Sequence, residues 1–293
     1  MTLSSSQKEA FAGYMFLVPV FSGFLVFLAF PVVASFFVSL ADWNMINDPG
    51  FVGIANYIDL FRDPFFWTCL GNTAYFSLFS VVIGLFVSLY LANLLHETRP
   101  RGAGFFKSTL FLPVILSSVA VALVWQWLLD SHMGMINHLL AGAGVPGVPW
   151  LTSPAMAMNS VILVAVWRQI GYNMVIFLAA LANVPDELYE ASSLDGASRN
   201  QTFWNVTWPM ISPATFFIAV TSVINSFQVF DLTTILTNGG PANSTNTLIM
   251  MIYQNGFQFF KMGYASAIAY ALFAIILVIT AVQTIVSKKW VHS

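Results

Sequence analysis

The chain has 293 residues, a formal net charge of −2, and only 8% charged residues against 58% hydrophobic ones. Soluble domains carry about 25% charged residues, so the composition excludes a soluble globular domain, and the hydrophobicity excludes a disordered chain. The mean hydropathy of +0.79 is typical of a protein whose main solvent is lipid. Cys69 is the single cysteine, which excludes an intrachain disulfide and a cysteine-based metal site. The near-neutral charge gives no support for nucleic-acid binding.

Long stretches without Asp, Glu, Lys or Arg predict six membrane-spanning helices. A spanning helix needs about 20 apolar residues, and only helices or closed barrels satisfy every backbone group within lipid. Barrel strands would alternate apolar and polar residues, whereas these stretches are continuously apolar apart from Arg168 in the fourth. We therefore predict an all-α polytopic membrane protein. Its spans lie at roughly 12–40, 70–95, 108–129, 156–182, 209–235 and 263–287.

The basic residues predict the orientation of these spans. With both termini in the cytoplasm, seven Lys and Arg residues lie inside and two outside, so the positive-inside rule favours this arrangement. The inside residues are Lys8, Arg99, Arg101, Lys107, Arg199, Lys288 and Lys289, and the outside residues are Arg62 and Lys261. The predicted organisation is a cytoplasmic N-terminus over 1–11, a single transmembrane domain over 12–287 and a cytoplasmic C-terminus over 288–293.

The longest cytoplasmic segment, 183–208, joins the fourth and fifth spans. Pro185 suits the first turn of a helix, and the acids that follow it suit the positive end of the helix dipole. Gly196 can take the left-handed conformation that ends a helix. A second short helix is predicted from Ser198 to about Val206, before Pro209 and Pro213 mark the entry to the fifth span.

This segment has two faces of different character. Its acids are Asp186, Glu187, Glu190 and Asp195, while Leu188, Ala191 and Leu194 lie on another side. A solvated acidic loop is one interpretation of the pattern. A short helix–Gly–helix unit with an apolar face is also typical of an element that docks onto a partner. The residues alone leave both interpretations open.

One run of this segment resembles a known motif. The run Glu190-Ala191-Ser192-Ser193-Leu194-Asp195-Gly196-Ala197, followed by Phe203, Pro209 and Pro213, resembles the EAA motif of ATP-binding-cassette importer permeases. In that family the motif forms a coupling helix that docks into a groove of the nucleotide-binding subunit. The family usually has Ala where this chain has Ser192, and both residues are small. The resemblance implies that ATPase coupling involves Glu187, Glu190, Ala191, Asp195, Gly196 and Ala197.

The resemblance extends over nearly the whole chain, from about Phe11 to the C-terminus. Four more segments look like the sugar-permease branch, which includes the maltose-type and glycerol-3-phosphate-type permeases. These segments are Gly134-Met135-Ile136-Asn137, Trp150-Leu151-Thr152-Ser153-Pro154, Phe177-Leu178-Ala179-Ala180-Leu181 and Leu236-Thr237-Asn238-Gly239-Gly240-Pro241. The resemblance implies a subunit that moves a carbohydrate or a polyol phosphate across a bacterial or archaeal plasma membrane by alternating access.

The resemblance also implies partners. They are a second homologous permease subunit, two ATPase subunits that use ATP and Mg²⁺, and one solute-binding protein outside. No cofactor is expected on this chain itself. Gly239, Gly240 and Pro241 are expected to form a rigid outside turn. The resemblance allows this turn to contact the binding protein.

Several catalytic patterns are missing from the sequence. There is no G-x-x-x-x-G-K-[ST] phosphate loop, no His-x-x-x-His pair and no G-x-S-x-G nucleophile elbow. We therefore expect a transport subunit without its own ATPase or other enzymatic site and without a metal. Two alternatives are a secondary transporter that works alone and a membrane scaffold that transports nothing. A secondary transporter would be expected to show internal repeats, which this chain lacks.

Arg168 is the first candidate for the transport path, because an ionisable residue within the membrane is costly unless it has a function or a partner. Tyr172 lies at i+4 on the same helical face, and Asn173 adds a polar group nearby. The alternatives are that Arg168 snorkels to the membrane surface, pairs with another helix, or lies beyond a shifted helix boundary.

A second set of candidates lies at the end of the predicted fifth span. Asn225, Gln228 and Asp231 are spaced i, i+3 and i+6, which predicts one side of a helix. They supply the donors and acceptors that sugar hydroxyls need once water is removed. Candidate aromatic platforms for a sugar ring are Trp125, Phe227 and Phe230. The alternative is that the amides only hydrogen-bond between helices.

Overall fold

The computed structural model describes residues 5–98 and 101–291. Predictions that concern residues 1–4, Arg99 and residues 292–293 lie outside this part. The described chain is built almost entirely of helices, which confirms the predicted all-α fold class. It packs as two compact units, and each unit is described by itself. The single transmembrane domain over 12–287 stays a prediction.

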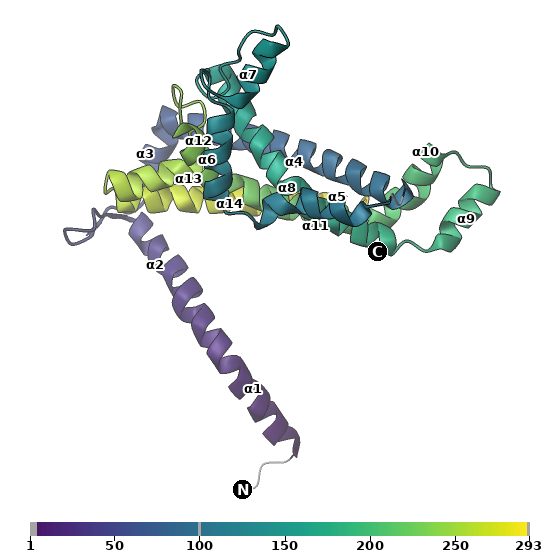
Figure 1. The fold of residues 1–293 in the computed structure, drawn as a ribbon. Helices are drawn as coiled ribbons and strands as arrows, with labels where there is room; N and C mark the ends of the chain where they lie inside the picture. Colours follow the sequence, from purple (N-terminus) through teal and green to yellow (C-terminus); the bar gives the residue numbers. More distant parts are fainter. Residues whose placement is uncertain (1–4, 99–100, 292–293) are drawn as a thin grey trace. The chain divides into compact units, whose positions relative to one another are not determined.

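The first unit combines the residues up to Arg62 with Ile252–Ala271. Its helices and strands are α1 (Ser5–Phe24), the π-helical turn η1 (Leu25–Ala29), α2 (Phe30–Ser39), the antiparallel pair β1 (Ala41–Asp42) and β2 (Gly50–Phe51), and α3 (Ala55–Arg62) (Figure 1). The stretch Gly13–Ser39 is long and apolar enough to cross a membrane, as predicted for the first span.

Close backbone contacts tie the hairpin of this unit to the start of the last helix, α14 (Met262–Ser287). The backbone N–H of Met262 donates to the carbonyl oxygen of Trp43 over 2.9 Å. A Cβ atom on Gly263 would lie 1.8 Å from the carbonyl oxygen of Ala41. Only glycine therefore fits at this approach.

The second unit combines Asp63–Met251 with the residues from Leu272 onward. Its centre is formed by α4 (Pro64–Thr98) and α8 (Pro154–Ala182), and α11 (Trp208–Phe227) packs against both (Figure 1). The other elements are α5 (Ala103–Ile115), α6 (Ser118–Leu128), α7 (Met135–Gly142), α9 (Asp186–Leu194), α10 (Arg199–Thr202), η2 (Phe203–Thr207) and α12 (Asp231–Thr237). The chain then enters the first unit through α13 (Leu248–Tyr253) and η3 (Gln254–Gln258).

Close packing holds the second unit together. Lipid is as apolar as a buried side chain, so van der Waals fit rather than removal from water drives helix association. Helices α5 and α8 cross so closely that a Cβ atom on Gly171 would lie 2.1 Å from the carbonyl oxygen of Leu110. One core of buried side chains joins α4, α8 and α11, and it includes Ala92, Met174, Phe177, Leu181, Ile211 and Ile218.

The third predicted span, 108–129, is not one straight helix. Helix α5 ends at Ile115, α6 begins at Ser118, and the two are bent by 101°. Pro113 removes a backbone donor, and Leu116 adopts an extended conformation with ψ of 146°, so the helical hydrogen bonding stops there. The described residues contain five single helices that can cross a membrane, or six spans if the bent pair is one.

The fifth predicted span, 209–235, also differs from the structure. The helical run begins earlier, at Arg199, and ends at Phe227. The residues predicted for its last two turns instead form a short connection and α12. The second, fourth and sixth predicted spans correspond to α4, α8 and α14, although α4 extends beyond the predicted 70–95 at both ends.

The two ends of α4 separate the segments predicted to lie inside from those predicted outside. Near its start, the Asn72 side chain donates to the carbonyl oxygens of Asn243 (2.8 Å) and Asn246 (2.9 Å) in a predicted outside loop. Near its end, Glu97 lies 3.8 Å from Arg199 in the predicted cytoplasmic segment. A helix of 35 residues is about 52 Å long, enough to cross a bilayer. The arrangement therefore agrees with the predicted alternation of sides.

Candidate functional site

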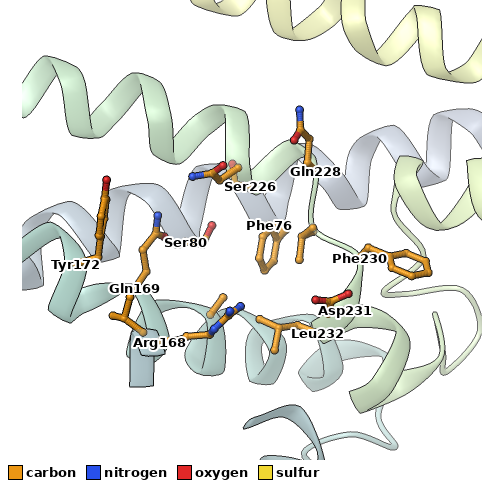
Figure 2. A pocket seen from close by; sticks show the side chains of 14 residues that line it. Phe76, Ser80, Arg168, Gln169, Tyr172, Ser226, Gln228, Phe230, Asp231 and Leu232 are labelled. Carbon is orange, nitrogen blue, oxygen red and sulfur yellow. The ribbon is translucent and has the colours of Figure 1, made fainter. Parts of the chain in front are cut away.

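A cavity of about 450 Å³ lies in the second unit, at the level where α8 meets the end of α11. Its volume is within the range of small-molecule sites in proteins. Side chains from α4, α8, α11 and α12 line it (Figure 2). The lining residues are Phe76, Ser80, Val114, Ala165, Arg168, Gln169, Tyr172, Asn225, Ser226, Gln228, Val229, Phe230, Asp231 and Leu232.

Helix α8 supplies the first polar side of this cavity. Arg168 and Tyr172 are one turn apart and both line it, as their i, i+4 spacing predicted. Gln169 joins them and donates to the hydroxyl of Ser222 over 3.2 Å. Arg168 is half-buried, and the structure shows no hydrogen bond or ion pair to its side chain within residues 5–98 and 101–291.

The second polar side comes from the break between α11 and α12. Helix α11 ends at Phe227, and the connection continues through Phe230, whose φ of −132° and ψ of −57° are not helical. The prediction that Asn225, Gln228 and Asp231 share one face of one helix is therefore wrong. The three residues still line the same cavity, because the connection turns the chain beside it.

Asp231 is fixed by a residue from another broken helix. The hydroxyl of Ser118, at the start of α6, donates to Oδ2 of Asp231, at the start of α12. The two helices pack side by side, and Gln126 of α6 donates to the carbonyl oxygen of Ile235 over 2.9 Å. Figure 2 shows Arg168 and Asp231 directed toward the same space from different elements.

Three predicted path residues lie elsewhere. Asn173 is 2% exposed, and it does not line the cavity although it neighbours Tyr172. Trp125 packs on a hydrophobic core and contacts Trp167 edge-on, with ring centroids 5.4 Å apart. Phe227 is buried and also lies outside the lining.

Sequence reasoning missed the contribution of α4 and the anchor of Asp231. Phe76 and Ser80 reach the cavity from α4, and Ser77 of the same helix hydrogen-bonds Ser226 at 2.6 Å. The i, i+3 spacing of Ser77 and Ser80 in an apolar span was the available signal. Ser118 gave no such signal, because its partner is 113 residues away in the sequence.

The predicted coupling segment forms a helical hairpin at the other end of α4. Helix α9 spans Asp186–Leu194, and Gly196 follows it with φ of +73°, as expected for a left-handed glycine that ends a helix. Pro185 is the residue before the helix rather than part of its first turn. The predicted second short helix is continuous with the fifth span, since α10, η2 and α11 form one helical run from Arg199 to Phe227.

Two side-chain contacts hold α9 against this run. Ser192 hydrogen-bonds Thr202 at 2.8 Å, and Tyr189 hydrogen-bonds Thr207 at 3.3 Å. Ser198, the residue before α10, caps this helix through a capping box formed with Gln201. The hydroxyl that replaces the usual alanine therefore has a structural partner inside the hairpin.

The outer surface of α9 is not covered by the rest of the described chain. Leu188 and Leu194 are 39% and 89% exposed. The predicted coupling residues Glu187, Glu190, Ala191, Asp195 and Gly196 are exposed as well, and Ala197 is half-buried. An apolar pair within an acidic surface is an arrangement that a protein partner can cover.

The predicted outside turn at Gly239, Gly240 and Pro241 is tightly held. Gly239 has φ of +79°, and its Cβ position lies 2.9 Å from the side chain of Asn246, so glycine is required there. The hydroxyl of Thr245 donates to the carbonyl oxygen of Gly240 over 2.9 Å. The turn is thus closely packed, and its rigidity stays a prediction.

A second ordered turn follows α6. The backbone N–H groups of Met133 and His132 donate to the carboxylate of Asp130 over 2.7 and 2.9 Å. These hydrogen bonds hold the pKa of Asp130 below its ordinary value, because they favour the charged form.

Comparisons with known proteins agree with one another. A family model described as "binding-protein-dependent transport system inner membrane component" matches residues 80–292. The probable ABC transporter permease protein YurN of Bacillus subtilis is 35% identical over 281 residues, which cover 94% of each chain. The lactose transport system permease protein LacF of Rhizobium radiobacter is 34% identical over 297 residues, which cover 98% of each chain.

A solved structure has the same fold over almost the full length. It is the crystal structure of a bacterial ABC transporter involved in the import of the acidic polysaccharide alginate. The TM-score is 0.85 at 25% sequence identity, and the match covers 96% of each chain.

Proposed function

The chain belongs to the family of binding-protein-dependent transport system inner membrane components, and from that premise we propose that it conducts a carbohydrate through the cavity beside α8. It is a multi-pass permease subunit of an ATP-binding-cassette importer in the inner membrane. Selectivity is shared with the solute-binding protein that delivers the solute.

The chemistry of the cavity supports a carbohydrate. A sugar carries many hydroxyl groups, each of which needs a partner once water is removed. Gln169, Asn225 and Gln228 offer amide donors and acceptors, and Ser80 and Tyr172 offer hydroxyls. Phe76 forms part of the apolar wall of the cavity, although it is otherwise buried in the hydrophobic core (Figure 2). The lactose permease among the relatives carries a solute of this class.

The coupling segment supports an ATP-driven mechanism. We infer that α9 docks through its exposed acids and leucines onto an ATPase subunit, and that this subunit binds ATP and Mg²⁺. This chain contributes no phosphate loop of its own. The full importer then contains a second homologous permease, two ATPase subunits and one solute-binding protein, which contacts the turn at Gly239–Pro241.

One helix connects the proposed docking element to the cavity. The run Arg199–Phe227 begins at the hairpin and carries Asn225 into the cavity lining. Ser192 and Tyr189 fix α9 to the start of this run. A displacement of α9 by the ATPases therefore acts directly on a rigid helix that ends at the transport path. Such a displacement switches the bundle between inward-facing and outward-facing states.

Reconstitution tests the proposal against its alternatives. The chain is purified with the proteins that it retains, and ATPase activity is measured with sugar-loaded and sugar-free binding protein. We expect an ATPase to copurify and its activity to rise with the sugar-loaded protein. Ion-coupled uptake by the purified single chain would favour a secondary transporter. Retention of a partner without any uptake would favour a scaffold.

A further inference from the structure

We propose that the transmembrane cavity is matched to an uncharged sugar and discriminates against uronates and sugar phosphates. The inference rests on the proposed function and narrows its substrate class. Its basis is the charge of the lining, in which Arg168 is the one basic and Asp231 the one acidic side chain among the described residues. They carry opposite charges, so the cavity as a whole is neutral.

The two charges are separate rather than joined. The ion pair between Arg199 and Glu97 is the one found within residues 5–98 and 101–291, so Arg168 and Asp231 do not neutralise each other by direct contact. They come from α8 and from the start of α12, and both face the cavity (Figure 2). A solute between them meets both charges at once.

An anionic solute gains little in such a site. A carboxylate or phosphate that approaches Arg168 also approaches Asp231, and charges close together inside a protein interact more strongly than in water. Attraction and repulsion therefore largely offset each other. The anion has still lost its water, and that loss remains uncompensated.

An uncharged sugar uses both groups without this conflict. The guanidinium donates hydrogen bonds to hydroxyl or ring oxygens, and the carboxylate accepts hydrogen bonds from hydroxyls. Hydrogen bonds that involve a charged partner are roughly twice as strong as neutral ones. Ser118 occupies Oδ2 of Asp231 and fixes its orientation, and no other hydrogen bond to this carboxylate occurs among the described residues. Oδ1 is thus available to a solute.

Saturation-transfer NMR on the complete importer in lipid nanodiscs, without the binding protein, tests this inference. The probes are lactose, digalacturonate and sn-glycerol-3-phosphate, each at the same concentration. We expect lactose to bind at least about tenfold more tightly than either anion. In Asp231→Asn the cavity gains a net positive charge. The affinity for each anion is then expected to rise about tenfold relative to the affinity for lactose.

Arg168→Gln should shift the ratio of anion affinity to lactose affinity in the opposite direction. Asp48 is an exposed acid outside the cavity, and Asp48→Asn should leave this ratio unchanged. Equal binding of lactose and digalacturonate to the unaltered importer would overturn the inference and leave the proposed function standing. An unchanged ratio in Asp231→Asn would also overturn it. If no sugar binds and none is taken up with the binding protein present, the proposed function fails as well.

Discussion

The hydroxyl of Ser118 donates a hydrogen bond to the carboxylate of Asp231, and this contact joins two interrupted helices at the edge of the cavity. Ser118 begins α6 just after the bend that follows α5, and Asp231 begins α12 just after the end of α11. Irregular backbone at membrane depth is tolerated where it lines a cavity or is covered by protein. Both interruptions are therefore explained by the site that they border.

Ser118→Ala should weaken solute handling without disturbing assembly. The alanine leaves Asp231 in place but removes the donor that orients it, and a hydrogen bond to a charged group contributes about 1.5–3 kcal/mol. Because Asp231 is exposed, we expect the lower end of this range, which corresponds to a KM for sugar-loaded binding protein raised about tenfold.

Ser118→Thr keeps the hydroxyl and should restore KM toward the unaltered value. The measurement is uptake into proteoliposomes, with kcat and KM determined separately. A fall in kcat with unchanged KM in Ser118→Ala would show that Ser118 acts on the transport cycle and not on the orientation of Asp231.

Asn225→Ala and Gln228→Ala should each impair uptake while membrane insertion and subunit assembly stay normal. Each variant removes an amide from the cavity and leaves a sugar hydroxyl without a partner, at a cost of about 1–3 kcal/mol. Uptake is measured in proteoliposomes, and assembly by copurification. Asn159→Ala is the control, because Asn159 lies on α8 outside the cavity lining. Unchanged transport kinetics in both variants would remove these residues from the path.

Gly196→Ala should lower transport and ATPase coupling more than it lowers insertion into the membrane. Its φ of +73° is unfavourable for alanine by about 1–2 kcal/mol, so the end of α9 is expected to shift. Gly144 is a matched control, since it has φ of +76° and equally open space at its Cβ position but lies in a segment predicted to be outside. Gly144→Ala should leave coupling intact.

Gly196→Pro is a stronger form of the same test, because proline fixes φ near −65°. The readout is the stimulation of ATPase activity by sugar-loaded binding protein, together with the amount of ATPase that copurifies. Normal stimulation in Gly196→Pro would contradict the proposed docking role of the segment. Glu190→Gln is expected to reduce association in the same assay through the loss of one exposed carboxylate.

The sequence predicted the helical spans well because each depends on local composition. A continuous apolar stretch must be helical in lipid, so α4, α8 and α14 followed directly from the spacing of charges. The left-handed glycine at Gly196 was predictable for the same reason, since its role is decided within one turn of the chain. Arg168 and Tyr172 lie together because both belong to one helix.

The interruptions were not predictable from composition. The stretch around Leu116 is as apolar as the helices that it interrupts, so hydropathy gives no boundary there. Around Val229, the polar residues Asn225, Gln228 and Asp231 have a spacing that also fits one face of a continuous helix. What stabilises the breaks are contacts between distant residues, such as Ser118 with Asp231 and Thr247 with the carbonyl oxygen of Val229. The spacing of Asn225 and Gln228 predicted that they share one face of a helix. They line the same cavity instead because the chain turns beside it after α11 ends.

The crossing of α5 and α8 predicts a strong asymmetry between two glycines of the membrane core. In Gly171→Ala the new Cβ atom would lie 2.1 Å from the carbonyl oxygen of Leu110, which belongs to the backbone and cannot rotate away. The helices must separate, and overpacking of this kind costs about 1–3 kcal/mol. Gly84→Ala in α4 is the control, because its Cβ position has no atom within 4 Å and alanine favours the helix by about 1 kcal/mol.

The unfolding midpoint of the purified importer in detergent measures both effects. We expect Gly171→Ala to lower it by several degrees, at about 2–4 °C for each kcal/mol, and Gly84→Ala to leave it unchanged or raise it. The bent pair of α5 and α6 also brings Ser118 to the cavity, so Gly171→Ala should raise KM for the sugar-loaded binding protein as Ser118→Ala does. A stable Gly171→Ala importer with unaltered KM would show that the close approach of α5 to α8 is not needed to place Ser118 beside Asp231.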